Sequence, residues 1–273
     1  MSRRELKGKV VLISGAAGGL GAALCQRFAA GGSLIAAMDS NPVGLDALVR
    51  SLEKAGAQAL ALPGDVTDAT LCQAAIASTL TRFGRLDGLI NNAGISHRSL
   101  LRATQPDVIR HIMDVNFFGA LHLTHAALAH VTAQRGFIAA ISSVAGFSPL
   151  IGRTGYAASK HALHGFFNSL RSEVEADGVS VTLVCPSFIR TGIGAAGLGG
   201  DGKAARGPRL TSGTESSAED IAERIFVAVA ESRPLLLPDR TARLAWWFSR
   251  LAPAAYSRIM KRRLGAEFEQ TPE

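Results

Sequence analysis

The sequence predicts an α/β fold, in which a doubly wound sheet of seven mostly parallel strands carries helices on both faces. Two observations lead to this prediction. Short apolar runs recur along the 273 residues, at 10–14, 34–38, 59–62, 86–90, 137–141, 179–184 and 235–237. Most intervals between them show helical spacing, with an apolar residue every three or four positions, as at Leu20, Leu24 and Phe28. Parallel strands need long crossovers of this kind, so the alternation indicates successive βαβ units.

Composition favours a globular enzyme. Apolar residues make up 47% of the chain and charged residues 19%, which suits a large core and argues against extended disorder. The three cysteines are widely spaced, so we expect buried thiols in a reducing, cytoplasmic setting rather than a disulfide framework or a zinc cluster. No uncharged apolar run reaches the roughly 20 residues of a spanning helix, and no signal peptide is recognised.

The net charge of +7 is concentrated near the end of the chain. Residues 240–263 contain seven basic side chains and no acidic one, whereas basic and acidic residues number 22 each in the rest. The body is therefore formally neutral, which removes most of the reason to expect nucleic-acid binding. We interpret 1–239 as one α/β domain and 240–273 as a basic, aromatic tail.

The first strand is followed by a glycine-rich turn. The segment from Ser14 reads SGAAGGLG, which places Gly15, Gly19, Leu20 and Gly21 where the next helix begins. Glycines let the backbone approach a pyrophosphate closely, and a helix N-terminus adds unpaired N–H groups and a favourable dipole. Alone, the turn could also be a tight strand-to-helix connection without a ligand.

The second strand ends at Asp39, where a carboxylate can accept hydrogen bonds from ribose hydroxyls and would repel a 2′-phosphate. Ser40 follows instead of arginine, so NAD is favoured over NADP as the cofactor. Alternatively, Asp39 caps the helix that begins near Asn41 and Pro42. Capping would not exclude the ribose contact.

Polar residues also follow the third and fourth strands. Asp65 and Val66 follow the third, and the tetrapeptide Asn-Asn-Ala-Gly at 91–94 follows the fourth. Doubly wound sheets bind ligands at these carboxyl ends. Both segments are therefore candidate cofactor contacts, although the tetrapeptide could be only a turn.

The most informative residues are Ser143, Tyr156 and Lys160. Tyr156 and Lys160 are four positions apart in a helical pattern and so share a face, while Ser143 follows the preceding strand. A phenol titrates near pH 10, and a neighbouring ammonium stabilises the phenolate. Lowering the pKa of Tyr156 by about three units takes about 4 kcal/mol, which one close cation in a dry site can supply. We therefore expect Tyr156 to exchange a proton with the substrate.

Together these segments resemble the short-chain dehydrogenase/reductase family over nearly all of residues 8–240. The turn from Ser14 is similar to that family's T-G-x-x-x-G-x-G, residues 91–94 match its N-N-A-G, and the Ser-Tyr-Lys set matches in order and spacing. The resemblance implies a Rossmann fold, NAD(P)-dependent alcohol dehydrogenase chemistry, and a homodimer or homotetramer. It also implies a fourth catalytic residue, Asn116, and cofactor contacts at Asp65, Val66, Asn92, Ala93, Gly94, Tyr156, Lys160, Pro186, Ile189 and Thr191.

One position departs from the family pattern. Where the family commonly has Pro-Gly before the nicotinamide contacts, this chain has Pro186-Ser187. The serine side chain is expected to narrow the approach of the cofactor.

The mechanism that the resemblance implies agrees with the chemistry of these residues. Tyr156, as phenolate, takes the alcohol proton while a hydride passes to the nicotinamide, and ketone reduction runs the same path backward. Ser143 donates a hydrogen bond to the substrate oxygen, Lys160 holds the nicotinamide ribose, and Asn116 orders a water between Lys160 and solvent. The alternatives are a catalytically silent NAD-binding regulatory protein and an NADP-dependent carbonyl reductase.

The substrate is expected to be a hydrophobic secondary alcohol or its ketone. Residues 147–153, the loop at 192–217 and the tail are mostly apolar and would line the pocket. The loop lacks an apolar period, so we interpret it as flexible, either a lid over substrate or plain disorder. Histidine pairs at 122/125 and 161/164 lack further ligands at usual spacing, and no metal is predicted.

The tail combines cations with apolar residues at helical spacing, including Leu244, Trp247, Phe248 and Leu251. Pro253 is expected to interrupt it, giving two short helices. Such a segment suits packing within the molecule or an oligomer, a position at the substrate entrance, or peripheral contact with an anionic membrane surface.

Overall fold

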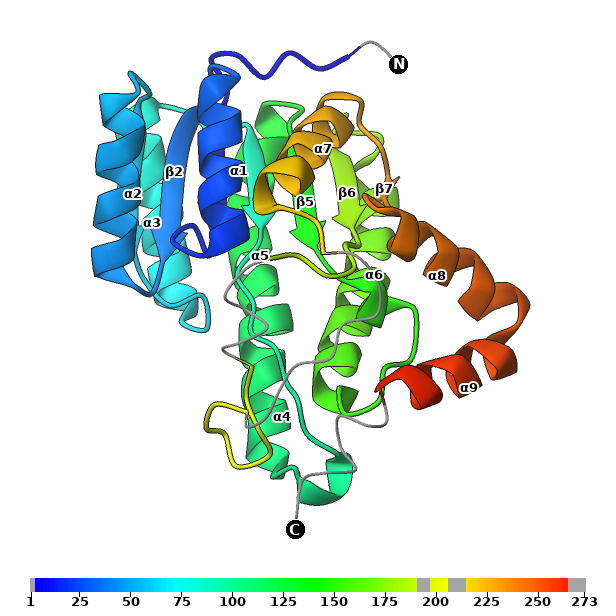
Figure 1. The fold of residues 1–273 in the computed structure, drawn as a ribbon. Coiled ribbons are helices and arrows are strands. Elements are labelled where there is room, and N and C mark those ends of the chain that lie inside the picture. Colours follow the sequence, from blue (N-terminus) through cyan, green and yellow to red (C-terminus); the bar gives the residue numbers. More distant parts are fainter. Residues whose placement is uncertain (1–2, 191–196, 206–214, 265–273) are drawn as a thin grey trace.

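The computed structural model describes residues 3–190, 197–205 and 215–264. It confirms the predicted α/β fold with seven strands, in the order β3-β2-β1-β4-β5-β6-β7. The sequence predicted a mostly parallel sheet, and every pair of neighbouring strands is in fact parallel. Helices cover both faces of the sheet, so the body has three layers (Figure 1).

The strands lie where the apolar runs predict them. They are β1 (Val10–Ser14), β2 (Leu34–Asp39), β3 (Ala59–Pro63), β4 (Gly88–Asn91), β5 (Phe137–Ile141), β6 (Ser180–Val184) and β7 (Leu235–Leu236). Their near-continuous apolar character reflects burial on both faces of the sheet. β4 begins two residues later than predicted, at Gly88. Asp87, just before it, is bound to Val10: its carboxylate accepts the Val10 N–H and its own N–H donates to the Val10 carbonyl.

One face of the sheet is covered by α1 (Gly19–Ala30), α2 (Pro42–Lys54) and α7 (Ala218–Ala230), and the other by α3 (Ala69–Phe83), α5 (Gly119–Ala133) and α6 (Thr154–Val174). A shorter helix, α4 (Pro106–Met113), continues through a π-helical turn at Asp114–Phe118 into α5. Each face has its own apolar core. The three cysteines are free thiols buried within this body, as the sequence predicted.

The strand order reverses at β1, because β2 pairs with one side of it and β4 with the other. The connections leaving β1 and β4 therefore diverge to opposite faces, which opens a crevice at the carboxyl ends of these two strands. The candidate residues after β1, β2, β3 and β4 all belong to this edge.

The tail forms two helices, α8 (Arg240–Leu251) and α9 (Pro253–Leu264), with Pro253 at the predicted break. They extend from the β7 edge, and α9 turns back toward α6 (Figure 1). A small separate core holds them against the body, formed by Val144, Ala242, Ala245 and Tyr256. Among the described residues, no helix combines the length and the apolar character needed to cross a membrane.

Part of the predicted flexible loop is bound to the body. The N–H of Leu198 donates to the Ser96 carbonyl at 2.9 Å, and its carbonyl accepts the Arg98 N–H at 2.8 Å. The Gln105 N–H donates to the Gly200 carbonyl at 2.9 Å. Residues 197–205 therefore lie along the segment that follows β4, while 191–196 and 206–214 lie outside the described residues.

Candidate active site

The glycine-rich turn packs too tightly for side chains at two positions. Gly15 has a φ of +63°, and a Cβ there would stand 2.8 Å from the Ala93 Cα. A Cβ on Gly21 would stand 1.9 Å from the Gly15 carbonyl oxygen. Gly18 caps α1 without a side-chain hydrogen bond, and Gly19, Leu20 and Gly21 line the cavity described below. The first turn of α1 thus presents backbone to a ligand, as pyrophosphate binding requires.

Ser14 and Asn92 fasten this turn to the end of β4. The Ser14 hydroxyl oxygen accepts the N–H groups of Asn92 and Ala93, each at 3.1 Å. The Asn92 side-chain amide donates to the carbonyls of Ser14, at 2.9 Å, and Gly15, at 3.1 Å. The 91–94 segment is therefore more than a turn, because it holds the glycine-rich turn in place.

Asp39 also binds the glycine-rich turn. One carboxylate oxygen accepts the Ala17 N–H at 2.9 Å, and the other accepts the Asn41 N–H at 2.8 Å. The cap of α2 is Asn41, whose side chain accepts the Gly44 N–H, so the alternative that Asp39 serves as the helix cap is wrong. Asp39 lines the cavity, and each of its oxygens has the capacity to accept a further hydrogen bond.

Asp65 and Val66 lie at the same wall, after β3. The Asp65 carboxylate accepts the Thr67 N–H at 2.9 Å, which fixes the turn. Val66 is buried, and its side chain occupies the space that a Cβ on Gly119 would take. Val66 thus joins this wall to the start of α5.

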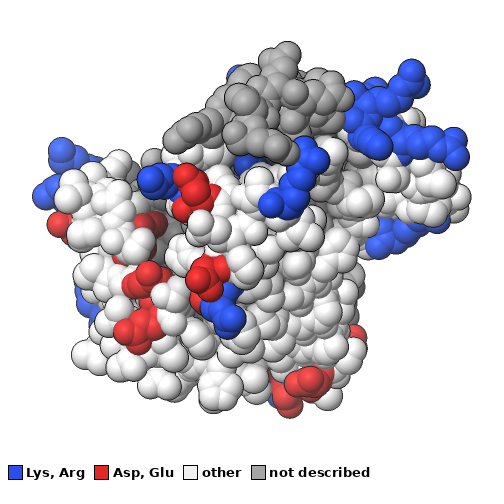
Figure 2. All heavy atoms as spheres, turned by 90° about the horizontal axis from the view of Figure 1, so that it is seen from below, with Lys and Arg blue, Asp and Glu red and all other residues white. Residues whose placement is uncertain are grey.

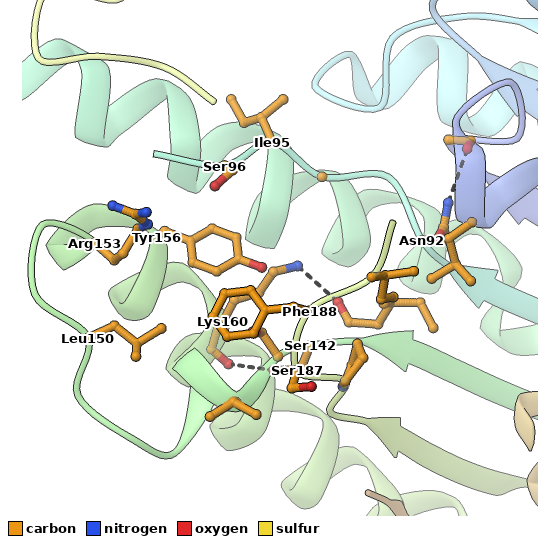
Figure 3. Close-up of a pocket in the computed structure, with 18 of the residues that line it drawn as sticks. Asn92, Ile95, Ser96, Ser142, Leu150, Arg153, Tyr156, Lys160, Ser187 and Phe188 are labelled. Atoms are coloured by element: carbon orange, nitrogen blue, oxygen red, sulfur yellow. Dashed lines mark hydrogen bonds between the residues drawn. The ribbon is translucent and has the colours of Figure 1, made fainter. Parts of the chain in front are cut away.

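Tyr156 and Lys160 share one face of α6, as predicted, and both point into the cavity (Figure 3). The Lys160 Nζ lies 5.7 Å from the centroid of the Tyr156 ring and donates to the Ile141 carbonyl at 2.9 Å. Lys160 is buried, and this burial lowers its pKa to about 8. A cation is thereby held beside the phenol in surroundings that screen it poorly.

Ser143 stands at the end of β5 and caps a short helical turn, Val144–Gly146. Its hydroxyl oxygen accepts the Ala145 N–H at 3.2 Å, which leaves the hydroxyl proton to be donated elsewhere. Ser143 lines the cavity together with Tyr156 and Lys160. The three residues predicted as a group are therefore brought together.

Asn116 lies buried in the π-helical turn between α4 and α5. Its Oδ1 accepts the Ile95 N–H at 2.7 Å, and its Nδ2 donates to the Ile95 carbonyl at 3.0 Å and to the Ser159 hydroxyl at 2.9 Å. Both amide protons are thus used to hold the segment after β4 against α6. A second lone pair on Oδ1 is the position at which a water could bind.

The segment after β6 connects the cavity to the tail. Pro186, Ser187 and Ile189 line the cavity, and Thr191 lies outside the described residues. The Ser187 hydroxyl donates to Asp239 Oδ1 at 2.7 Å, and its N–H donates to Oδ2 at 3.0 Å. The serine that departs from the family pattern is therefore hydrogen-bonded to Asp239.

Asp239 was not identified from the sequence as a site residue. It caps α8, because Oδ1 also accepts the Ala242 N–H at 2.8 Å. An aspartate directly before a helical pattern signals a cap. Its partner lies 52 residues away along the chain, and nothing in the pattern indicates that pairing.

These walls enclose a single cavity of about 820 Å³. Asp39 and Asp65 lie at one part of its lining, and Tyr156, Lys160 and Ser143 at another. The tail also contributes to the lining, with Thr241, Leu244, Ala245, Phe248, Tyr256, Ile259, Met260 and Arg263. Arg98 and Ser96 are among the lining residues that the sequence did not single out.

The site fits an NAD(P) cofactor on these observations. The glycine-rich turn offers backbone where side chains cannot stand, a carboxylate lies beside it, and the cavity continues from there to Tyr156 and Lys160. Asp39 and Asp65 would hold the adenosine part, and Lys160 the nicotinamide ribose.

Comparisons with known proteins agree with this geometry. The short chain dehydrogenase family model matches residues 9–197. A dehydrogenase/reductase SDR family protein 7-like from Anopheles gambiae is 36% identical over 267 residues, which cover 95% of this chain and 84% of that protein. Dehydrogenase/reductase SDR family member 7B from Mus musculus is 35% identical over 272 residues, which cover 97% and 84%.

Two solved structures share the fold. A short chain dehydrogenase/reductase from Burkholderia phymatum in complex with NAD has a TM-score of 0.81 and 24% identity, covering 98% of this chain and 99% of that one. A short-chain dehydrogenase from Streptomyces avermitilis has a TM-score of 0.80 and 26% identity, covering 96% and 100%. With a family match over well over half of its residues and relatives above 30% identity along nearly its whole length, the chain belongs to the short-chain dehydrogenase/reductase family of NAD(P)-dependent oxidoreductases.

Proposed function

We propose that this protein transfers a hydride between NAD and a hydrophobic secondary alcohol or its ketone. The observation that carries the proposal is the buried Lys160 ammonium, 5.7 Å from the Tyr156 ring centroid, with Ser143 on the same cavity. A buried cation beside a phenol favours the phenolate, which is the form that accepts a proton from an alcohol.

The chain's own residues move the proton and hold the substrate oxygen. When bound, NAD supplies the hydride acceptor. Tyr156 takes the hydroxyl proton of the alcohol during oxidation and returns it to the oxygen during reduction. Ser143 donates its hydroxyl proton to that same oxygen, since its own oxygen already accepts the Ala145 N–H.

NAD is proposed over NADP because of Asp39. Its carboxylate is held against the glycine-rich turn by the Ala17 N–H, so a 2′-phosphate there would meet a fixed negative charge. We expect Asp39→Ala to lower the ratio of kcat/KM with NAD to kcat/KM with NADP by at least about tenfold, since one close like charge costs about 1.4 kcal/mol or more. Asp46→Ala, an exposed position on α2, should leave the ratio unchanged. An unchanged ratio in Asp39→Ala would remove this basis for NAD.

A hydrophobic substrate is proposed because apolar side chains of α8 and α9 line the cavity. The test is a panel of secondary alcohols and ketones, graded by chain length and ring number, with NAD reduction or NADH oxidation followed optically. We expect kcat/KM to rise with apolar size. A preference for small polar alcohols would contradict the proposal.

The catalytic assignment is tested with Tyr156→Phe, which removes only the phenol oxygen. We expect kcat to fall by at least about a hundredfold, the usual share of a general acid or base, while NAD binding measured by calorimetry is retained. Full activity in this variant would refute the mechanism. Absence of turnover across the panel in the parent, with NAD still bound, would instead favour a catalytically silent NAD-binding protein.

A further inference from the structure

The outer face of α8 exposes large apolar side chains. Leu244 is 61% exposed, Trp247 63% and Leu251 78%. Their spacing of three, four and seven positions places them on one side of the helix, with the partly exposed Phe248 beside them. The opposite side carries Ala242 and Ala245, which are buried against the body. Buried alanines therefore lie on the inner side of the helix, and Leu244, Trp247 and Leu251 are exposed on the other side.

Helices α8 and α9 together carry seven cations, of which Arg250 lies inward over the Trp246 ring and Arg263 lines the cavity. Along α8 they are Arg240, Arg243 and Arg250, and along α9 Arg258, Lys261, Arg262 and Arg263, with no acidic residue between 240 and 263. Figure 2 shows blue side chains gathered over this edge of the molecule, whereas red and blue are mixed on the remainder of the visible face. A helix with exposed tryptophan and leucine between arginines suits the boundary between lipid headgroups and acyl chains.

Aromatic contacts join the two helices to the body and to each other. The Trp246 ring packs edge-on against Phe147 at 4.8 Å between centroids, and the Arg250 guanidinium lies 3.2 Å over the Trp246 ring. Phe248 and Tyr256 pack edge-on at 5.9 Å, which joins α8 to α9. These contacts use the inner side of the pair and leave Trp247 and Leu251 outside.

We propose that the α8–α9 surface, defined by the exposed apolar residues of α8 and the seven cations of 240–263, docks on membranes that contain anionic lipids. An anionic surface attracts the cations that face outward, while the apolar side chains enter the interface. A second copy of the chain fits this surface less well. A two-fold contact would place the same patch against itself and bring cations of the two copies together.

The docked surface borders the cavity, since Leu244, Phe248 and Ile259 line it. If the proposed function holds, an apolar substrate dissolved in the bilayer would lie close to these lining residues. The docking itself does not depend on the reaction, so its test uses binding and not activity.

The test is flotation of the full chain with vesicles of phosphatidylcholine alone or mixed with phosphatidylserine, at physiological salt. We expect binding to the mixed vesicles and little to the neutral ones. Arg243→Glu/Arg258→Glu should lower the partition coefficient at least about tenfold, since reversing two cations removes both attractions. Trp247→Ser/Leu251→Ser should lower it comparably. These four positions are exposed and lie outside the cavity lining.

The matched controls are Arg50→Glu/Lys54→Glu and Val43→Ser on α2, which carry the same kinds of change at exposed sites far from the tail. Both should bind mixed vesicles as the parent does. A direct readout is Trp246→Phe, which leaves Trp247 as the one tryptophan, and its fluorescence should shift to shorter wavelength with mixed vesicles.

Two results would overturn the proposal. One is equal flotation of the parent and the charge-reversed variant. The other is failure of the parent to bind mixed vesicles while sedimentation shows self-association that Trp247→Ser/Leu251→Ser abolishes, which would assign the surface to a second copy of the chain. Circular dichroism of each variant confirms that the fold is retained.

Discussion

Lys160 combines burial with a charge that the proposed reaction requires. Its Nζ donates to the Ile141 carbonyl at 2.9 Å and lies beside Gly94, where a Cβ would make an ordinary contact with Nζ at 3.5 Å. Burial without a carboxylate partner among the described residues lowers the pKa of Lys160 to about 8. Keeping the Lys160 ammonium charged beside Tyr156 therefore lowers the free energy of unfolding of the protein.

That cost makes stability depend on pH in a definite direction. A lysine in the unfolded chain titrates near 10.4. Between pH 8 and about 10.4 the unfolded state binds a proton that the folded state lacks, so the Lys160 contribution to the free energy of unfolding rises with pH. Below pH 8 the full destabilisation, about 3 kcal/mol, is present. Lys160→Met should remove this dependence.

Urea unfolding of the parent and Lys160→Met at a series of pH values measures the effect. The stability of the variant relative to the parent should fall by about 3 kcal/mol from pH 7 to pH 10.5, because other titrating groups are shared and cancel. Lys54→Met, an exposed position on α2, should differ from its parent by a constant amount. A constant difference for Lys160→Met as well would mean that its charge is not destabilised by burial.

Gly21 shows how closely the glycine-rich turn is packed. A methyl group there would stand 1.9 Å from the Gly15 carbonyl oxygen, so Gly21→Ala must displace backbone. We expect it to cost about 1–3 kcal/mol in unfolding free energy and to weaken NAD binding at least about tenfold.

Gly165→Ala on α6 is the matched control, because a Cβ there meets nothing within 4 Å. It should stabilise the helix by about 0.5–1 kcal/mol and leave NAD binding unchanged. Equal NAD affinity in both variants would show that the turn tolerates a side chain.

At the scale of elements, the hydrogen bonds between Ser187 and Asp239 join the segment after β6 to the start of α8. A double-mutant cycle measures this connection, with Ser187→Ala, Asp239→Ala and both together. We expect a coupling energy of about 1–2 kcal/mol, as for a hydrogen bond to a charged group.

Ser217→Ala supplies the control for this cycle. Ser217 caps α7 by accepting the Asp220 N–H, so the single change has a similar cost, but no hydrogen bond joins it to Asp239. Combined with Asp239→Ala, it should be additive within about 0.5 kcal/mol. A Ser187–Asp239 coupling no larger than this would show that the two residues act independently.

The elements themselves were largely predictable, and the reason is physical. Strands buried on both faces must be apolar throughout, so the runs at 10–14 and 137–141 were found at their exact bounds. Pro253 fixed the break in the tail because proline cannot donate an intrahelical hydrogen bond. The binding of residues 197–205 to the segment after β4 could not be predicted, since backbone hydrogen bonds between distant segments leave no periodic pattern.

At the scale of the whole molecule, the candidate site was predictable as far as topology determines it. Parallel strands bring their carboxyl ends to one edge, so residues after β1, β2, β3, β4 and β5 had to converge. The position of α8 and α9 beside this edge of the sheet depends on side-chain packing around Val144 and Tyr256. Helical spacing in the tail predicted the two helices but left open which surface they pack against.

That packing predicts two levels of stability within one chain. α7 and α8 have nearly equal lengths, but α7 buries eight residues in the main core while α8 buries two alanines. Hydrogen exchange of the full chain should therefore show α7 amides opening only with global unfolding, with a strong dependence on urea. α8 amides should open locally, at a free energy of opening roughly 2 kcal/mol lower or more, with little urea dependence.

Phe28→Leu, which loosens the core that α7 shares with α1, should reduce protection of the α7 amides from exchange and leave protection of the α8 amides unchanged. Identical opening energies and urea slopes in the two helices would mean that the tail is part of the cooperative core, and that its position over the cavity is as permanent as the sheet.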